Sequence, residues 1–283
     1  MSSASKGKPD NSFQPNPHPS GAGWSKHQVS PMRYRFLLVV FAALSTSTCA
    51  QDTPDLQERK ERIKSIETSA TADALKRKDR SDARLALEGV PVNESLPAIE
   101  DVGEMKRRTR DEVAWRAMAL LVVAVKGEGL DQASVDKLVQ DYRLKEHFSP
   151  EEAAFISQAS PSDHDRVQFS WRYETAWTLL WALGYVEDLS KPTAICDVPR
   201  AVKIMQQRSA EQFIADAKLR STEEVAEQAD LIYRYHWAVV DARINGKPAP
   251  AGLEPGVTME RHYALNWLIG YMGQEWDDIS TDT

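Results

Sequence analysis

Cysteine is scarce in this sequence, with only Cys49 and Cys196 among 283 residues. Two cysteines form at most one disulfide, which excludes a disulfide-rich scaffold and a zinc site built from paired Cys-x-x-Cys motifs. If Cys49 is removed with an export signal, Cys196 remains alone. We then expect Cys196 to be a small buried side chain rather than a catalytic thiol.

Several motifs of common catalytic folds are also missing. The sequence has no G-x-G-x-x-G, G-x-x-x-x-G-K-[ST], G-x-S-x-G or H-E-x-x-H motif, so it lacks these signatures of nucleotide binding, serine hydrolysis and zinc catalysis. Basic residues never form a run longer than the triplet at 76–78. The net charge is −7, and the first 50 residues hold five basic residues against one acidic residue, so the remaining chain carries −11. This balance excludes nucleic acid as an expected partner.

No stretch of the chain shows sustained alternation of apolar and polar residues. Such alternation is typical of half-buried strands, so we predict an all-α fold with little or no sheet. Seven of the eight tryptophans lie between Trp115 and Trp276, which places the expected core in the C-terminal two-thirds of the chain. The length is ample to bury such a core.

Residues 32–50 have the three-part order of a secretory signal. A basic segment at 32–35 precedes an apolar run of nine residues at 36–44, and small polar residues follow. Nine residues are about half of the ~20 that a membrane-spanning helix needs, so we expect no membrane span once the signal is removed. Residues 1–31 show no apolar periodicity and are expected to be disordered, or untranslated if synthesis starts at Met32.

The cleavage site is expected directly before Gln51, because Thr48 and Ala50 supply small residues at the two positions that a signal peptidase reads. The mature protein is therefore predicted to be exported, either to the periplasm or to the medium. Acylation of Cys49 is the less favoured alternative, since residues 46–48 are a poor match to a lipoprotein signal.

The mature chain is predicted to have a charged first segment and one helical domain. Residues 51–88 are dense in charge and are expected to form one or two solvated helices with a break near Ser81. Glycine and proline at 89–97 lead into the domain, residues 89–283. Its expected helices cover residues 111–126, 134–147, a short segment from 150, 175–186, 198–218, 221–244 and 258–272.

Residues 175–186 are expected to form the central helix of that domain. These twelve residues carry no charge, and their large side chains cover almost the whole circumference of a helix. A helix that is apolar all round is buried, so we expect a Trp-rich central helix in which Trp177, Trp181 and Tyr185 belong to the core. Three capping boxes are also expected, at Ser149/Glu152, Ser209/Gln212 and Ser221/Glu224.

Several stretches of the chain resemble one known family. They include Cys-Asp-Val-Pro at 196–199 and Tyr-Arg-Tyr-His-Trp-Ala at 233–238, and the others lie at 89–97, 171–184, 241–243, 260–268 and 275–278. In this order they are similar to the bacterial family catalogued as domain of unknown function 4272. The resemblance implies a bacterial origin and a single domain, and it assigns no catalytic or binding residue.

Charged residues in the apolar sectors of three helices are the candidates for a functional site. In the helix at 221–244, His236 and Arg243 share the sector of the apolar residues, whereas Asp230, Arg234 and Asp241 lie opposite on a face expected to be solvated. A buried guanidinium needs a carboxylate or several acceptors, so Arg243 and its counterpart on the last helix, Arg261, are each expected to pair with a carboxylate.

The helix ends that carry these residues are expected to meet in one polar cluster. Its members are Arg172, Glu174, His236, Arg243, Glu260, Arg261, His262 and Asn266. The cluster has two interpretations, a structural network that fixes the helix register and an open cleft whose surplus of arginine would bind an anion. We predict no metal, since the spacing of Glu260 and His262 puts them on different sides of a helix, and no cofactor.

Two functions remain open at this point. The first is a non-enzymatic exported module that binds a partner protein or a small anion. The alternative is a hydrolase-like enzyme that uses the Glu and His residues of the cluster. An enzyme needs the cluster to line an open cleft that one of the histidines reaches, whereas an interaction module can have it sealed.

Overall fold

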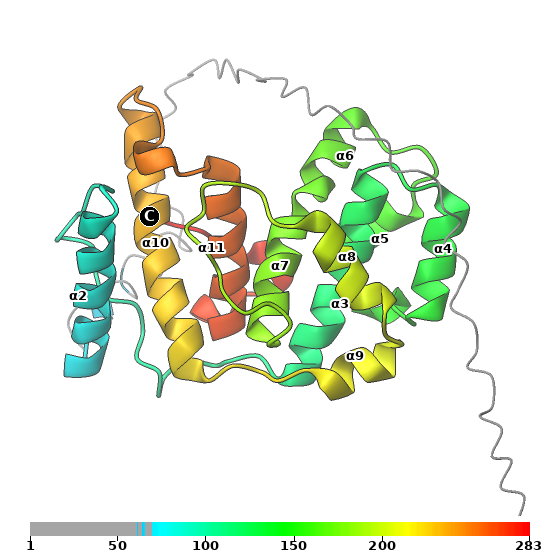
Figure 1. The fold of residues 1–283 in the computed structure, drawn as a ribbon, viewed down its shortest axis with the longest axis horizontal. Coiled ribbons are helices and arrows are strands. Elements are labelled where there is room, and N and C mark those ends of the chain that lie inside the picture. Colours follow the sequence, from blue (N-terminus) through cyan, green and yellow to red (C-terminus); the bar gives the residue numbers. More distant parts are fainter. Residues whose placement is uncertain (1–60, 62–63, 66–69) are drawn as a thin grey trace, which may run out of the picture. The chain divides into compact units, whose positions relative to one another are not determined.

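The computed structural model describes residues 61, 64–65 and 70–283 (Figure 1). All of these residues belong to one compact unit. The predicted signal peptide at 32–50 and the extension before it lie outside the described residues. Within the described part there is no strand, which confirms the predicted all-α fold.

The helices are short to medium in length and are joined by compact loops. They are α2 (Ala72–Leu87), α3 (Arg110–Gly127), α4 (Gln132–Asp141), η1 (Lys145–His147), α5 (Pro150–Ser157), α6 (Asp163–Ser170), α7 (Arg172–Ala182), α8 (Val198–Gln206), α9 (Ala210–Asp216), α10 (Thr222–Ile244), η2 (Pro250–Gly252), α11 (Pro255–Ile269), η3 (Tyr271–Gly273) and η4 (Trp276–Asp278).

Local sequence signals place most of the helix ends. The three predicted capping boxes, which begin α5, α9 and α10, are confirmed, and Thr109 with Glu112 forms a fourth at the start of α3. The helices predicted at 198–218 are α8 and α9, and the second begins after its predicted cap, Ser209. The last long helix ends three residues earlier than predicted, since Gly270 takes the left-handed conformation with φ 70°.

The predicted central helix is confirmed as α7, although it ends at Ala182, so Tyr185 lies outside it and is half-buried. All residues from Tyr173 to Ala182 are buried, Trp177 and Trp181 among them. In Figure 1 the helices α2, α10, α11, α7 and α3 follow one another across the domain, and each packs against the next. α4, α5 and α6 then pack on α3. The core therefore runs through α3, α7, α10 and α11.

The face of α10 that was expected to be solvated is covered by α2. Asp230 and Arg234 are 0% and 1% exposed, so that expectation is wrong for both, while Asp241 is half-buried. The physical reason is that the two charges neutralise each other: Arg234 Nε and Nη2 each donate to Asp230 at 2.9 Å. Nor does α2 break near Ser81, which is buried within a continuous helix.

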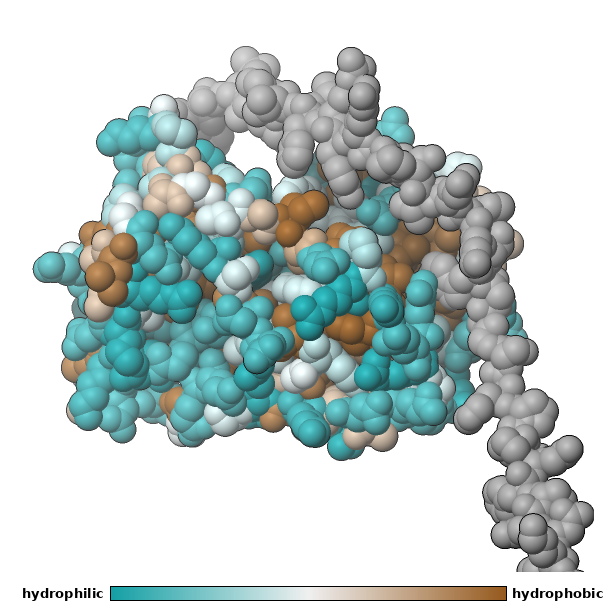
Figure 2. Space-filling view, viewed as in Figure 1, coloured by the Kyte–Doolittle hydropathy of each residue, from teal (hydrophilic) through white to brown (hydrophobic). Residues whose placement is uncertain are grey.

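Hydrophilic residues cover most of the face seen in Figure 2, and hydrophobic residues occur there as separate patches. Large exposed hydrophobic side chains among the described residues include Leu87, Val167 and Ile244. None of the helices in the described ranges is both long enough and apolar enough to cross a membrane.

Candidate functional site

The predicted polar cluster separates into two ion pairs, in which only Arg172 is partly exposed, and a histidine pair beside a pocket. The first ion pair joins α7 to α11. Arg172 Nη1 lies 3.1 Å from Glu260 Oε2, and Thr175 Oγ1 donates to the same oxygen at 3.2 Å. The guanidinium of Arg172 also lies over the ring of Tyr263, 5.0 Å from its centre. Glu260 is buried, so this carboxylate acts inside the core and not toward solvent.

The second ion pair also joins α7 to α11. Arg261 Nε lies 3.7 Å from Glu174 Oε2, which confirms the predicted pairing of Arg261 with a carboxylate. Arg261 Nη1 donates to the carbonyl of Ser190 at 2.6 Å, and the backbone N–H of Cys196 donates to Glu174. Burial raises the pKa of Glu174 and lowers the pKa of Arg261. Both groups are therefore desolvated and held by protein partners, as the structural interpretation of the cluster predicts.

Cys196 lies beside this pair and is itself buried. Burial raises the pKa of its thiol, and the charge of Glu174 adds to that effect. A thiol with a raised pKa is not a nucleophile near neutral pH, because the reactive form is the thiolate. The structure thus agrees with the prediction of a small buried side chain.

Arg243 does not join the cluster, and the prediction that it is buried and paired with Glu174 or Glu260 is wrong. It is exposed, and the next residue, Ile244, is 75% exposed and ends α10. The last turn of α10 therefore lies at the surface, where the apolar sector of the helix no longer faces the core. The positive charge of Arg243 still acts on His236 and is one of the causes that lower the pKa of His236.

A further buried ion pair was not predicted from the sequence. Arg116 of α3 pairs with Glu152 of α5, and the two side chains are 7% and 2% exposed. Arg116 also lies over the ring of Trp276, 4.7 Å from its centre. The signal was present in the sequence, since Arg116 interrupts the apolar run of a helix that was expected to be buried.

The histidine pair links α10 to α11. Nδ1 of His236 lies 2.8 Å from Nδ1 of His262, and the rings meet edge to face. Burial lowers the pKa of His236 to about 4 and places the pKa of His262 well below its usual value. Both rings are therefore neutral at pH 7. One of them donates from Nδ1 and the other accepts, so their Nε2 atoms have opposite roles.

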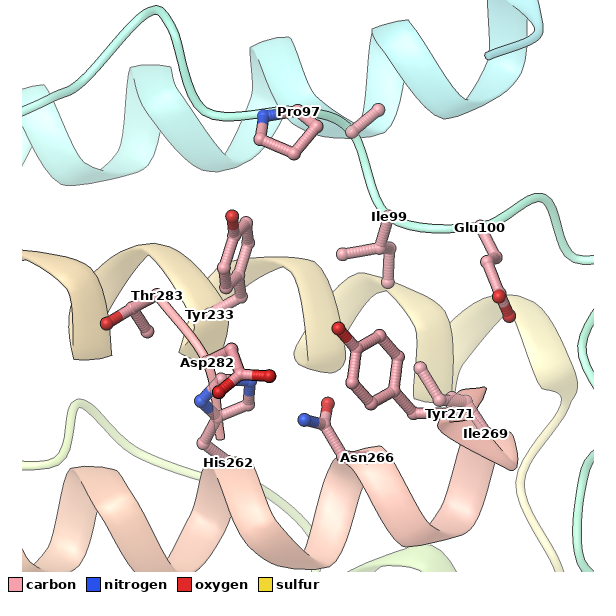
Figure 3. Close-up of a pocket in the computed structure, with 11 residues that line it drawn as sticks. Pro97, Ile99, Glu100, Tyr233, His262, Asn266, Ile269, Tyr271, Asp282 and Thr283 are labelled. Carbon is pink, nitrogen blue, oxygen red and sulfur yellow. The ribbon is translucent and has the colours of Figure 1, made fainter. Parts of the chain in front are cut away.

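A pocket of about 160 Å³ opens beside His262 (Figure 3). Its walls come from the segment that follows α2, from α10, from α11 and from the residues after α11. The lining residues are Pro97, Ala98, Ile99, Glu100, Tyr233, His262, Asn266, Ile269, Tyr271, Asp282 and Thr283. In Figure 3 the side chains of Ile99, Tyr271 and Asn266 converge on the space.

The lining of the pocket is acidic, in contrast to the expected surplus of arginine. It contains Glu100 and Asp282 and neither a lysine nor an arginine among the described residues. The arginines expected to line a cleft, Arg172 and Arg261, are held in ion pairs with Glu260 and Glu174, and Arg243 is at the surface. The structure therefore brings only His262 and Asn266 of the eight predicted residues into the pocket wall.

The remaining pocket residues lie mostly in loops, which is why the sequence analysis did not find them. Glu100 and Asp282 belong to irregular segments whose side-chain directions follow no helical period. Arg77 of α2 holds one of these segments in place, because its Nη2 donates to the carbonyls of Ile99 and Glu100 at 3.0 and 2.7 Å. Among the residues with described placement, no group of three or more His, Cys, Asp or Glu side chains could hold a metal ion.

The fold and this arrangement define an all-α domain with a charge network and a small acidic pocket between its helices. The chain belongs to the family described as domain of unknown function (DUF4272), whose model matches residues 77–279. This confirms the family resemblance found in the sequence. The match includes most of α2, so this helix is part of the family domain. No curated protein and no solved structure matches the chain.

Proposed function

We propose that this protein is a binding module for a small molecule and that the ligand occupies the pocket beside His262. The observation that carries the proposal is the polar wall of that pocket. His262, which is 2% exposed, and Asn266 bring two polar side chains of α11 to the pocket, where the other lining groups include isoleucine and tyrosine side chains. A few polar groups placed among apolar ones give a small-molecule site its orientation and specificity.

The size of the pocket supports a small ligand over a partner protein. A cavity of about 150 Å³ admits one benzene-sized molecule, and the pocket here is of that order. Its wall combines apolar and aromatic groups with a few polar atoms, as small-molecule sites generally do. Of the two ligand types considered from the sequence, a partner protein and a small anion, the size of the pocket favours a small ligand, but its acidic lining does not favour an anion.

The two glutamates that the hydrolase alternative needs do not line the pocket. Glu174 and Glu260 lie in ion pairs with Arg261 and Arg172, so neither reaches the pocket. His262 remains at the pocket wall without either of the glutamates that the enzyme hypothesis assigned to it. A binding role needs only the residues that line the pocket, so we prefer it.

Ligand-observed NMR with a mixed library of small amines, alcohols and carboxylates tests the proposal. Ile99 points into the pocket in Figure 3 and is only half-buried, so Ile99→Trp should fill the space with little cost to the fold. We expect compounds that bind the full-length protein and are lost in Ile99→Trp at unchanged thermal stability. If no compound in any class distinguishes the two proteins, the proposed function is wrong.

We also propose that the protein acts outside the cytoplasm, as the three-part signal at 32–50 predicts. The mature chain should then begin at Gln51. Intact mass measurement and N-terminal sequencing of the protein purified from its natural source test this. A mature species that retains Met1 or Met32 would contradict export by this signal.

A further inference from the structure

We infer that the ligand of this pocket is a neutral, compact and apolar molecule, bound through contact with apolar and aromatic side chains. The inference rests on the proposed function, which concerns only where a small molecule binds. The apolar part of the lining and the volume of the pocket carry it. The class of ligand is a small aromatic or branched hydrocarbon, or a compound whose buried part is one.

The apolar part of the lining comes from segments that are far apart in the sequence. Pro97, Ala98 and Ile99 lie in the segment after α2, and Ile269 is the last residue of α11. Ala98 and Ile269 are 4% and 2% exposed, and Ile99 is half-buried. Ile269 belongs to the hydrophobic core, and Ile99 and Tyr271 pack against that core. An apolar molecule in the pocket would therefore extend the core.

Aromatic rings form another part of the wall. Tyr233 of α10, His262 of α11 and Tyr271 of η3 line the pocket, and the centres of the Tyr233 and His262 rings are 5.9 Å apart. In Figure 3 the ring of Tyr271 points into the space. Aromatic side chains offer a large contact area and pack well with a further ring, either edge to face or offset. A benzene-sized molecule thus matches this wall in shape as well as in polarity.

The polar groups of the wall interact with other parts of the protein. His262 shares a hydrogen bond with His236 at 2.8 Å, and Nδ2 of Asn266 donates to the carbonyl of Ser280 at 2.9 Å. The other polar lining residues with interactions of their own are Glu100, Tyr233, Tyr271 and Asp282. A polar ligand would lose its hydration and would have to share or displace these interactions, whereas an apolar ligand leaves them unchanged.

Transfer of the ligand out of water supplies the driving force for binding. Water beside apolar groups is released when an apolar molecule takes its place, and this release is favourable. The volume of about 160 Å³ admits one molecule of about the size of benzene. Burial of apolar surface lowers the heat capacity, so binding of such a molecule should show a negative change in heat capacity.

Three probes of nearly the same shape separate the effect of polarity from that of size. They are ethylbenzene, benzyl alcohol and benzylamine, each titrated into the full-length protein near neutral pH by isothermal calorimetry and protein-observed NMR. A buried hydroxyl or ammonium group loses its hydration. We therefore expect benzyl alcohol to bind about tenfold more weakly than ethylbenzene, and benzylamine to bind more weakly still.

Variants of one isoleucine locate the site. Ile99→Ala removes apolar contact from the wall and should weaken ethylbenzene about fivefold, and Ile99→Trp should abolish its binding. Ile99 is half-buried, so both variants should fold, and thermal denaturation checks this. Ile195→Ala is the matched control, because Ile195 is 43% exposed and is not one of the lining residues, and it should leave the affinity for ethylbenzene unchanged.

The outcomes distinguish this inference from the proposed function. If benzylamine binds as tightly as ethylbenzene and Ile99→Trp abolishes that binding, the pocket is a ligand site and the inference of an apolar ligand is wrong. The inference is also overturned if ethylbenzene binds the unchanged protein, Ile99→Ala and Ile99→Trp equally well. Absence of binding by all three probes overturns it as well, whereas the proposed function fails only if the mixed library also yields no pocket ligand.

Discussion

At the scale of single residues, Arg261 and Arg243 offer a matched pair of arginines. Arg261 is buried with Glu174 at 3.7 Å, whereas Arg243 is exposed. Removing one partner of a buried ion pair leaves an uncompensated charge, so Arg261→Ala should lower the free energy of unfolding by about 3–5 kcal/mol. Arg243→Ala should change it by less than about 0.5 kcal/mol. Urea denaturation of both variants measures the difference, and similar losses in both would contradict the assignment.

The histidine pair predicts a dependence of stability on pH. An unfolded histidine titrates near ~6.5, and the folded pKa of His236 is lowered to about 4, with His262 also lowered. Between these values the unfolded chain binds protons that the folded chain does not. The free energy of unfolding should therefore fall as the pH falls below ~6.5, by up to about 1.4 kcal/mol per pH unit for each histidine, and it should be unaffected above that range.

Urea denaturation between pH 7.5 and pH 5 measures this slope. His236→Gln should reduce the slope, because the variant has one group fewer that gains a proton on unfolding. His164→Gln is the control, since His164 is exposed on α6, and its slope should equal that of the unchanged protein. Equal slopes in all three proteins would show that the buried histidines do not govern the pH dependence.

Residue-level prediction from the sequence worked where a helix sets the direction of a side chain. The pairing of Arg261 with a carboxylate follows from its place in the apolar sector of α11. The same reasoning failed for Arg243, because helical position does not say where the neighbouring helices end. It also could not find Glu100 or Asp282, whose positions depend on how irregular segments cross the surface of α10 and α11.

At the scale of the helices, Gly127 allows α6 to approach the end of α3. A Cβ atom at this position would lie 2.7 Å from the backbone nitrogen of Ser170 and 2.8 Å from the carbonyl oxygen of Arg166. Backbone atoms cannot move aside singly, so Gly127→Ala should push α6 outward and cost about 1–3 kcal/mol. Gly103→Ala is the control, because a Cβ there meets nothing within 4 Å.

Chemical denaturation and hydrogen exchange test the role of Gly127 together. Gly127→Ala should lower the free energy of unfolding and reduce the protection of the amides in α6, while Gly103→Ala should do neither. Unchanged protection of α6 in Gly127→Ala would contradict the close approach of the two helices.

Most of the helices were predictable from the sequence. Which face of each helix is covered by another helix was not. Capping residues and apolar periodicity predicted α3, α5, α7, α10 and most of α11. α6 escaped prediction because its eight residues include none that is fully buried, so they carry no clear apolar period. The docking of α2 on α10 was not predicted either, because charged residues usually indicate an exposed face. Here Arg77 and Asp230 are buried because each forms hydrogen bonds or an ion pair with a protein partner.

At the scale of the domain, one continuous core predicts one unfolding transition. Buried side chains from α2 to η4 form a single cluster that includes Leu85, Trp181, Trp267 and Trp276. Seven tryptophans lie at 115–276, so their fluorescence reports on this core. Thermal or urea unfolding followed by tryptophan fluorescence should coincide with unfolding followed by far-UV circular dichroism. Two separated transitions would show that the helices form more than one cooperative unit.

The pocket wall has a consequence for the order in which the protein becomes functional. Glu100 lies near the start of the described domain and Asp282 near its end, and the ribosome releases the chain from its N-terminus. During synthesis, α3 and α7 can pack while the pocket still lacks α11 and its second carboxylate. A chain cut short after α11 would keep most of its helices and its core, and it would still be unable to complete the site. The proposed ligand pocket is thus complete only after the segment that follows α11 has been synthesised.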